Sequence, residues 1–212
     1  MIDLARAVAG ATAAALVPPR CAGCDTPGAW FCLVCRRDLE PKAFAAGAMR
    51  VRAAGAYDGS LRLAIQRCKY RDERGLTAEL GDLLAALVAE DLALGATLDA
   101  LVPVPLHPAR ARARGYDQSA LLAARVTRRT GVPVTGALRR IRPTRPQVEL
   151  DRSHRVRNVR GAFVAEAGPL RGRRVAIVDD VTTTGATCLA AAAAARAAGA
   201  RDVRAYVVAV DE

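Results

Sequence analysis

Hydrophobic and polar positions follow two different patterns along the chain. From about Val51 onward, short apolar runs of strand length alternate with longer segments in which apolar residues recur at helical spacing. This alternation is typical of a parallel α/β sheet flanked by helices. The first forty residues differ, because they hold four of the six cysteines, the only Trp and several Pro and Gly residues. We therefore expect an N-terminal helix and a cysteine-rich module in residues 1–48, and an α/β domain in residues 49–212.

The α/β part contains a regular series of predicted elements. Leu76 to Val88 carries apolar residues three and four positions apart with acidic residues between them, which predicts a helix. Further helices are predicted over 118–129 and 186–198, and strands over 98–104, 132–138, 173–178 and 203–210. Residues 139–160 lack sustained apolar periodicity, and we expect a mobile, exposed loop there. Ligands of such sheets bind at the carboxyl ends of the strands.

The chain carries an excess of positive charge. Lys and Arg number 32 against 21 Asp and Glu, and the net charge of +11 favours phosphate-rich partners such as nucleotides or nucleic acid. Aromatic residues make up only 4%, so the stacking platforms of single-strand binders are largely missing. The apolar stretch Ala7 to Val17 is too short to span a membrane and lacks the charge pattern of a secretory signal. We therefore expect a packed N-terminal helix, no membrane association and a cytoplasmic location.

The clearest chemical signal follows the predicted strand that ends at Val178. Asp179 and Asp180 come next, and two adjacent carboxylates are too costly to bury without partners, so they must face solvent, a metal or hydroxyl groups. A loop rich in Thr then opens a predicted helix, where free N–H groups and the helix dipole form an anion site. The expected 5′-phosphate contacts are Thr182, Thr183, Thr184, Gly185, Ala186 and Thr187. The simpler alternative is an ordinary capped helix, and a Walker A loop is excluded because no Gly-Lys-Ser/Thr follows.

Two further segments combine positive charge with loop character. The first follows the strand that ends near Val104 and contains Arg110 and Arg114, which together with backbone N–H groups are candidates to hold a diphosphate. Lys69, expected in a loop before the long helix, is another candidate to reach a phosphate. The second segment, residues 139–160, contains eight arginines and suits a lid over a pyrophosphate leaving group. The alternatives are a solvated basic turn for the first segment and an Arg-rich face or tether for the second.

The N-terminal cysteines form two Cys-x-x-Cys pairs that are seven residues apart. The four residues are Cys21, Cys24, Cys32 and Cys35. Two thiolate pairs at this spacing predict a structural zinc site with four sulfur ligands. Disulfides are the alternative, and a reducing compartment disfavours them. We expect Trp30 and Phe31 to pack against this module, and we assign no chemical role to Cys68 or Cys188.

These stretches together resemble the ComF family, competence-associated proteins with a phosphoribosyltransferase fold. The apolar strand, the Asp-Asp pair and the Thr-Thr-Gly-x-Thr loop are similar to the motif with which type I phosphoribosyltransferases bind phosphoribosyl pyrophosphate (PRPP). The rest of the likeness is carried by the cysteine quartet, Tyr57-Asp58-Gly59 with Lys69-Tyr70, Pro103-Val104-Pro105-Leu106 with Arg114-Gly115-Tyr116-Asp117-Gln118, and Arg142-x-x-x-x-Gln147 with Arg155-x-x-Asn158-Val159-x-Gly161-Ala162-Phe163. Asp117 departs from the pattern, in which Asn is expected.

The resemblance implies a type I phosphoribosyltransferase-like parallel sheet, preceded by a four-cysteine zinc ribbon, that binds PRPP with Mg²⁺. The implied catalytic residues are Asp179, Asp180, Arg155 and Gln147. The implied pyrophosphate contacts are Lys69, Val104, Pro105, Leu106, His107, Arg110 and Arg114. The implied flexible-loop residues are Arg142, Gln147, Arg152, Arg155 and Asn158. The expected reaction transfers ribose 5-phosphate from PRPP to an unidentified acceptor base and releases pyrophosphate. The alternative is a non-catalytic, PRPP-responsive protein that handles single-stranded DNA, and the sequence leaves the oligomeric state open.

Overall fold

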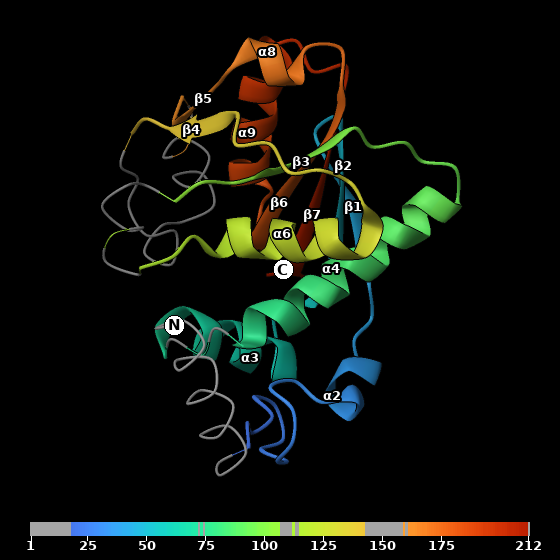
Figure 1. Cartoon of the computed structure of the whole chain (residues 1–212), viewed down its shortest axis with the longest axis vertical. Coiled ribbons are helices and arrows are strands. Elements are labelled where there is room, and N and C mark those ends of the chain that lie inside the picture. Colours follow the sequence, from blue (N-terminus) through green and yellow to red (C-terminus); the bar gives the residue numbers. More distant parts are fainter. Residues whose placement is uncertain are drawn as a thin grey trace, which may run out of the picture.

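A five-stranded, mostly parallel sheet forms the centre of the protein (Figure 1). The computed structural model describes residues 18–71, 73, 75–106, 112, 115–142, 159 and 161–211. The strand order is β1-β2-β7-β6-β3, with β1 at Lys42–Ala46, β2 at Met49–Ala56, β3 at Ala100–Pro103, β6 at Arg174–Thr182 and β7 at Asp202–Val210. Only β1 runs antiparallel to its neighbour. The predicted α/β fold class is confirmed.

Helices cover both faces of the sheet, because its central strands alternate apolar side chains between two cores. The first core joins Ala176, Val178 and Tyr206 to three helices. These are α3 (Gly59–Tyr70), α4 (Gly75–Ala93) and α6 (Gln118–Thr130). The second core joins Val175 and Ile177 to α9, at Ala186–Ala197. The predicted helices over 76–88, 118–129 and 186–198 are therefore confirmed.

Two sequence expectations fail beside the sheet. Residues 132–138 were expected to form a strand, but among them only Val134 makes an isolated bridge, to Leu101, before the strand that starts at Leu138. Pro133 accounts for this, because it has no N–H for a regular ladder. The segment from Arg139 was expected to be a loop throughout, but β4 (Leu138–Arg140) pairs with β5 (Phe163–Ala165) in a second, two-stranded sheet.

The cysteine-rich module packs directly onto the α/β part. Cys21, Phe31 and Cys35 belong to the same buried core as residues of α3 and α4. Short helix α2 (Leu33–Arg37) follows within the module, and β1 then enters the main sheet. The boundary expected after residue 48 thus falls inside the β1–β2 hairpin.

Helix α3 was not predicted, and it changes the place of one candidate. Lys69 lies in the last turn of α3 and not in a loop. The sequence of α3 mixes apolar residues with Arg, Lys and Gln, and Leu61, Ile65 and Cys68 form part of its buried face. Short helix α8 (Ala167–Leu170) precedes β6. Among the described helices, none combines the length and the apolar character that a membrane span requires.

Candidate functional site

Strand β6 carries Asp179 and Asp180 to its carboxyl end, where they meet two helices. The Ser119 hydroxyl at the start of α6 donates to Asp179 Oδ1 over 3.1 Å. The Lys69 ammonium of α3 donates to Asp180 Oδ1 over 2.9 Å. The two carboxyl oxygens also accept the N–H groups of Asp180 and Val181. Both carboxylates are half-buried and hydrogen-bonded. They therefore face protein groups as well as solvent at this end of the sheet.

The two carboxyl groups differ electrostatically. Burial, with the Asp180 carboxylate next to it, raises the pKa of Asp179 to about 7. Burial alone would lower the pKa of Lys69, but the adjacent Asp180 carboxylate raises it, so the ammonium stays charged. The Asp180 carboxylate is therefore held in an ion pair with Lys69, while the pKa of Asp179 lies near neutral pH. The oxygens of the two carboxyl groups can accept hydrogen bonds from hydroxyl groups or coordinate a cation.

The loop after β6 has the shape of an anion cradle. Buried Thr182 accepts the Gly185 N–H on its hydroxyl over 3.1 Å. Gly185 has φ 74°, and a Cβ there would lie 2.7 Å from the Cβ of Ala46, so only glycine fits. The hydroxyl of Thr184 is buried and has no hydrogen-bond partner in the described part of the chain. The N-cap residue of α9 is Gly185, which has no side chain to cap the first turn, so the N–H groups at the start of α9 and the Thr184 hydroxyl suit a bound phosphate.

The turn after β3 is only partly described. Val104 N–H donates to the Val178 carbonyl, and Leu106 N–H donates to Asp117 Oδ2 over 3.0 Å. Pro105 has no N–H, so in this conformation these three residues present no open backbone donor to a diphosphate. His107, Arg110 and Arg114 lie outside the described residues.

Asp117 has a local structural role. Its Oδ1 accepts the Ala120 N–H and caps α6, while its Oδ2 holds Leu106. Each bond uses a different carboxylate oxygen as acceptor, whereas an Asn side chain has a single acceptor oxygen, so the Asp of this chain can make both bonds. The departure from the expected Asn therefore leaves this turn intact.

The Arg-rich segment enters the described structure only at its two ends. Arg140 stacks over the Phe163 ring, 5.3 Å from its centroid, and Arg142 follows on the surface. Val159 is buried at the other end. The candidates Gln147, Arg152, Arg155 and Asn158 lie outside the described residues.

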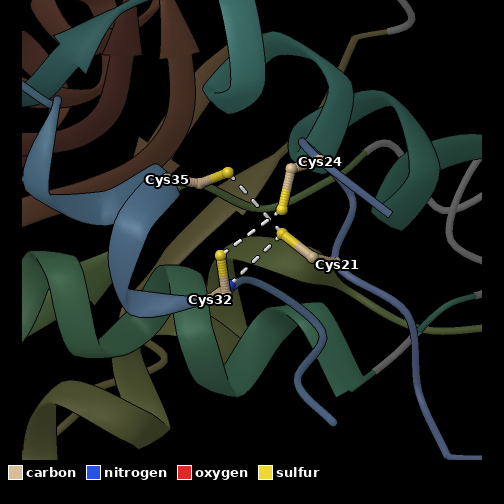
Figure 2. Close-up of side chains that lie close together, drawn as sticks. All are labelled: Cys21, Cys24, Cys32 and Cys35. Atoms are coloured by element: carbon tan, nitrogen blue, oxygen red, sulfur yellow. Dashed lines mark hydrogen bonds between the residues drawn. The ribbon is translucent and has the colours of Figure 1, made fainter. Parts of the chain in front are cut away.

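The four N-terminal cysteines converge on one point (Figure 2). All four sulfur atoms lie within 4.8 Å of one another, with Cys21 and Cys35 3.7 Å apart and Cys24 and Cys32 3.6 Å apart. A tetrahedral zinc with bonds of about 2.3 Å requires sulfur atoms about 3.8 Å apart. Burial would raise the pKa of Cys21, but backbone N–H donors lower it to about 6, which favours the thiolate. The cluster therefore fits a structural zinc ion.

Sequence reasoning missed two contributors to the site. Ser119 fixes Asp179, and the β1–β2 hairpin packs Ala46 against Gly185. Neither has a sequence signal, because each contact joins segments far apart in the chain. Lys69 was named as a phosphate contact, but its pairing with Asp180 emerges only when α3 meets β6.

The chain is similar in sequence to two curated proteins that are named for competence and for DNA utilization. Competence protein F of Haemophilus influenzae is 33% identical over 141 residues, 63% of this chain and 60% of that protein. DNA utilization protein YhgH of Salmonella typhimurium is 32% identical over 171 residues, 79% of this chain and 73% of that protein. The chain thus spans three fifths of the first relative and nearly three quarters of the second. No family model matches the chain.

Solved structures give partial superpositions. Glutamine PRPP amidotransferase from B. subtilis, 25% identical, covers 62% of this chain and 25% of its own with a TM-score of 0.42. Purine phosphoribosyltransferase from Pyrococcus horikoshii, 18% identical, covers 62% of this chain and 82% of its own with a TM-score of 0.38. The fold class accordingly rests on the order and direction of the strands.

Proposed function

The chain belongs to the ComF family, which includes competence protein F and DNA utilization protein YhgH, and we propose that its α/β domain binds PRPP together with Mg²⁺. One observation carries this proposal: Asp179 and Asp180 stand directly before an anion cradle at the end of β6. PRPP carries two neighbouring ribose hydroxyls, which can donate to the two neighbouring carboxylates. Its 5′-phosphate can bind the N–H groups at the start of α9.

Each part of PRPP has a proposed partner. The 5′-phosphate lies on residues 182–187, and the ribose hydroxyls donate to Asp179 and Asp180. Lys69, whose ammonium lies 2.9 Å from Asp180 Oδ1, is the proposed contact of a ligand phosphate beside this carboxylate. Mg²⁺ supplies positive charge to the diphosphate when it is bound with PRPP. Arginines of the turn at residues 104–115 and of the loop at residues 142–160 remain predicted partners of the pyrophosphate.

The proposed reaction is transfer of ribose 5-phosphate. The C1′–oxygen bond to pyrophosphate breaks, an acceptor nitrogen forms the new bond to C1′, and pyrophosphate leaves with the electron pair. Asp179 and Asp180 hold the ribose while positive charge develops on it, and the predicted loop residues Gln147 and Arg155 stabilise the leaving group. The acceptor base remains open.

A non-catalytic, PRPP-responsive role in handling single-stranded DNA is the second candidate. The names of the relatives and the net charge of +11 favour it. Zinc held by thiolates requires reduced cysteines, and we propose the cytoplasm as the location.

Calorimetry with PRPP on the full chain tests the ligand, with and without Mg²⁺. We expect binding in the presence of Mg²⁺, abolished by Asp179→Asn and retained by Asp202→Asn, which removes an equal charge from an exposed position. Equal binding by both variants would place the ligand elsewhere.

A base screen for pyrophosphate release then separates the two candidates, because a pure sensor releases none. Binding to single-stranded DNA that weakens steeply with salt supports the second role. Salt-independent DNA binding, or none, argues against it.

A further inference from the structure

Helix α3 is held at both ends by the cysteine module. Near its start, the Ser60 hydroxyl donates to the Cys35 carbonyl over 3.4 Å. Near its end, Arg67 Nη1 donates to the Cys21 carbonyl, also over 3.4 Å. A Cβ on Gly23 would lie 2.6 Å from the Cβ of Ser60, so the module's backbone rests on the first turn of the helix. Both carbonyls belong to cysteines of the sulfur cluster, so the position of the helix depends on the geometry of that cluster.

The module and α3 also share one apolar core. Cys21 and Phe31 are fully buried, and they lie in the same cluster as Leu61 and Ile65 of α3. Figure 1 shows the blue module lying against α3 and the start of α4. The module has too few apolar side chains to form a core without these neighbours, so its contacts with α3 contribute to its stability.

The opposite side of α3 reaches the proposed ligand site. Lys69 follows Arg67 by two residues, which is a rotation of about 200° around a helix, so the two side chains leave on opposite sides. Arg67 turns to the module and is fixed there by Glu73, while Lys69 Nζ lies 2.9 Å from Asp180 Oδ1. One rigid helix thus lies between the cysteine cluster and a carboxylate assigned to the ribose.

Resting on the proposed function, we propose that metal binding by the four cysteines and PRPP binding at Asp180 are coupled through α3, with Lys69 as the positioning residue. With the metal bound, α3 is held so that the Lys69 ammonium reaches Asp180 and the ligand's phosphates. Without it, the Cys21 and Cys35 carbonyls move, α3 loosens, and Lys69 loses its place. Coupling of this kind is reciprocal, so PRPP with Mg²⁺ tightens metal retention by the same factor.

The test compares the full chain with zinc and after zinc has been stripped, with the chelator removed before Mg²⁺ is added. We expect PRPP affinity to fall about tenfold on zinc removal, and zinc release to slow by a similar factor when PRPP and Mg²⁺ are present. Hydrogen exchange provides a readout that needs no ligand: amides of α3 and of residues 179–181 should exchange faster in the zinc-free protein. Unchanged affinity together with unchanged exchange would overturn the coupling.

Two variants keep the test decisive if zinc removal unfolds the chain. Arg67→Gln, studied with zinc bound, cuts the tie between α3 and Cys21 and should weaken PRPP binding several-fold, while Arg128→Gln removes the same charge from an exposed position of α6 and should not. Lys69→Met should make the remaining PRPP affinity insensitive to zinc. If Arg67→Gln and Arg128→Gln bind PRPP alike, α3 is not the link, and if Lys69→Met stays zinc-sensitive, Lys69 is not the positioning residue.

The two proposals fail in distinguishable ways. If the zinc-loaded parent does not bind PRPP with Mg²⁺, the proposed function is wrong. Amide hydrogen exchange in α3 and residues 179–181, compared with and without zinc, then still decides whether the cysteine cluster controls the position of Lys69.

Discussion

Replacing Asp179 with Asn should stabilise the free protein while removing ligand binding, because this carboxyl is electrostatically unfavourable in the folded chain. Burial and the neighbouring Asp180 carboxylate raise the pKa of Asp179 from its ordinary value of 3.8 to about 7. An asparagine has nearly the same shape and keeps an oxygen for the Ser119 hydroxyl, which lies 3.1 Å from Asp179 Oδ1. It has no charge to desolvate, so the main cost disappears.

Proton linkage gives the sign and the size of the effect. The folded state holds the Asp179 proton more tightly than the unfolded state does. The destabilisation therefore begins above the ordinary pKa, grows with pH, and is complete once pH passes the folded value of about 7. Such a rise corresponds to at most about 4 kcal/mol near pH 8.5 and to about half of that near pH 5.5. The asparagine accepts weaker hydrogen bonds than a carboxylate, so we expect a net gain of about 1–2 kcal/mol at pH 8.5.

Urea unfolding of the zinc-loaded protein at pH 5.5 and 8.5, followed by circular dichroism, measures this gain. Asp99→Asn is the control of opposite sign, because bonds from Arg174 hold the pKa of Asp99 at about 2 and its carboxylate stabilises the fold at both pH values. Asp180→Asn should lose about 2 kcal/mol, since it removes the charged acceptor of the largely buried Lys69 ammonium. Destabilisation by Asp179→Asn at pH 8.5, or an effect that is the same at both pH values, would refute the reasoning.

Three further predictions concern other parts of the fold. Protein purified without added zinc should contain about one zinc per chain by metal analysis, and metal-free protein with oxidised cysteines would contradict the thiolate site. Gly185→Ala should cost about 1–3 kcal/mol in unfolding free energy and abolish PRPP binding, because φ is 74° and Ala46 fills the space; parental binding by calorimetry would argue against the cradle. Tyr206→Phe should cost about 1 kcal/mol in urea unfolding by removing the buried 2.6 Å hydrogen bond to Asp91, with PRPP affinity unchanged; a neutral result would show that this bond contributes nothing.

Elements with strong local patterns could be predicted from the sequence. The helix around Leu80 carries apolar residues at helical spacing, and the residues directly before Asp179 are all hydrophobic. Each local pattern was therefore enough to predict its element. The motif after Val178 predicted a ligand site, and the structure brings both acids and the Thr-rich loop to the end of β6, while PRPP binding there stays a prediction. The strand itself proved longer than predicted and runs through both acids to Thr182.

Features that depend on distant partners could not be predicted. The residues before Leu138 are apolar enough for a strand, but Pro133 leaves only an isolated bridge at the sheet edge. Residues of β4 are rich in arginine and have no strand pattern, and their pairing with β5 comes from sequence more than twenty residues away. The spacing of the cysteines predicted their convergence, but not that Cys21 and Phe31 would enter the main core.

The position of Lys69 shows how the site combines stability with binding. An isolated pair of adjacent carboxylates would repel each other at the end of β6, and the Lys69 ammonium neutralises one of them within the fold, at 2.9 Å from Asp180. Burial and the neighbouring Asp180 carboxylate raise the pKa of Asp179 to about 7, and within the described residues no ion pair with Asp179 offsets this rise. The free protein is thus left with one unfavourable charge, and a ligand that brings hydroxyl donors and a divalent cation relieves it. Under the proposed function, part of the binding free energy comes from relief of this electrostatic cost, so Asp179 is expected both to destabilise the free fold and to contribute to ligand binding.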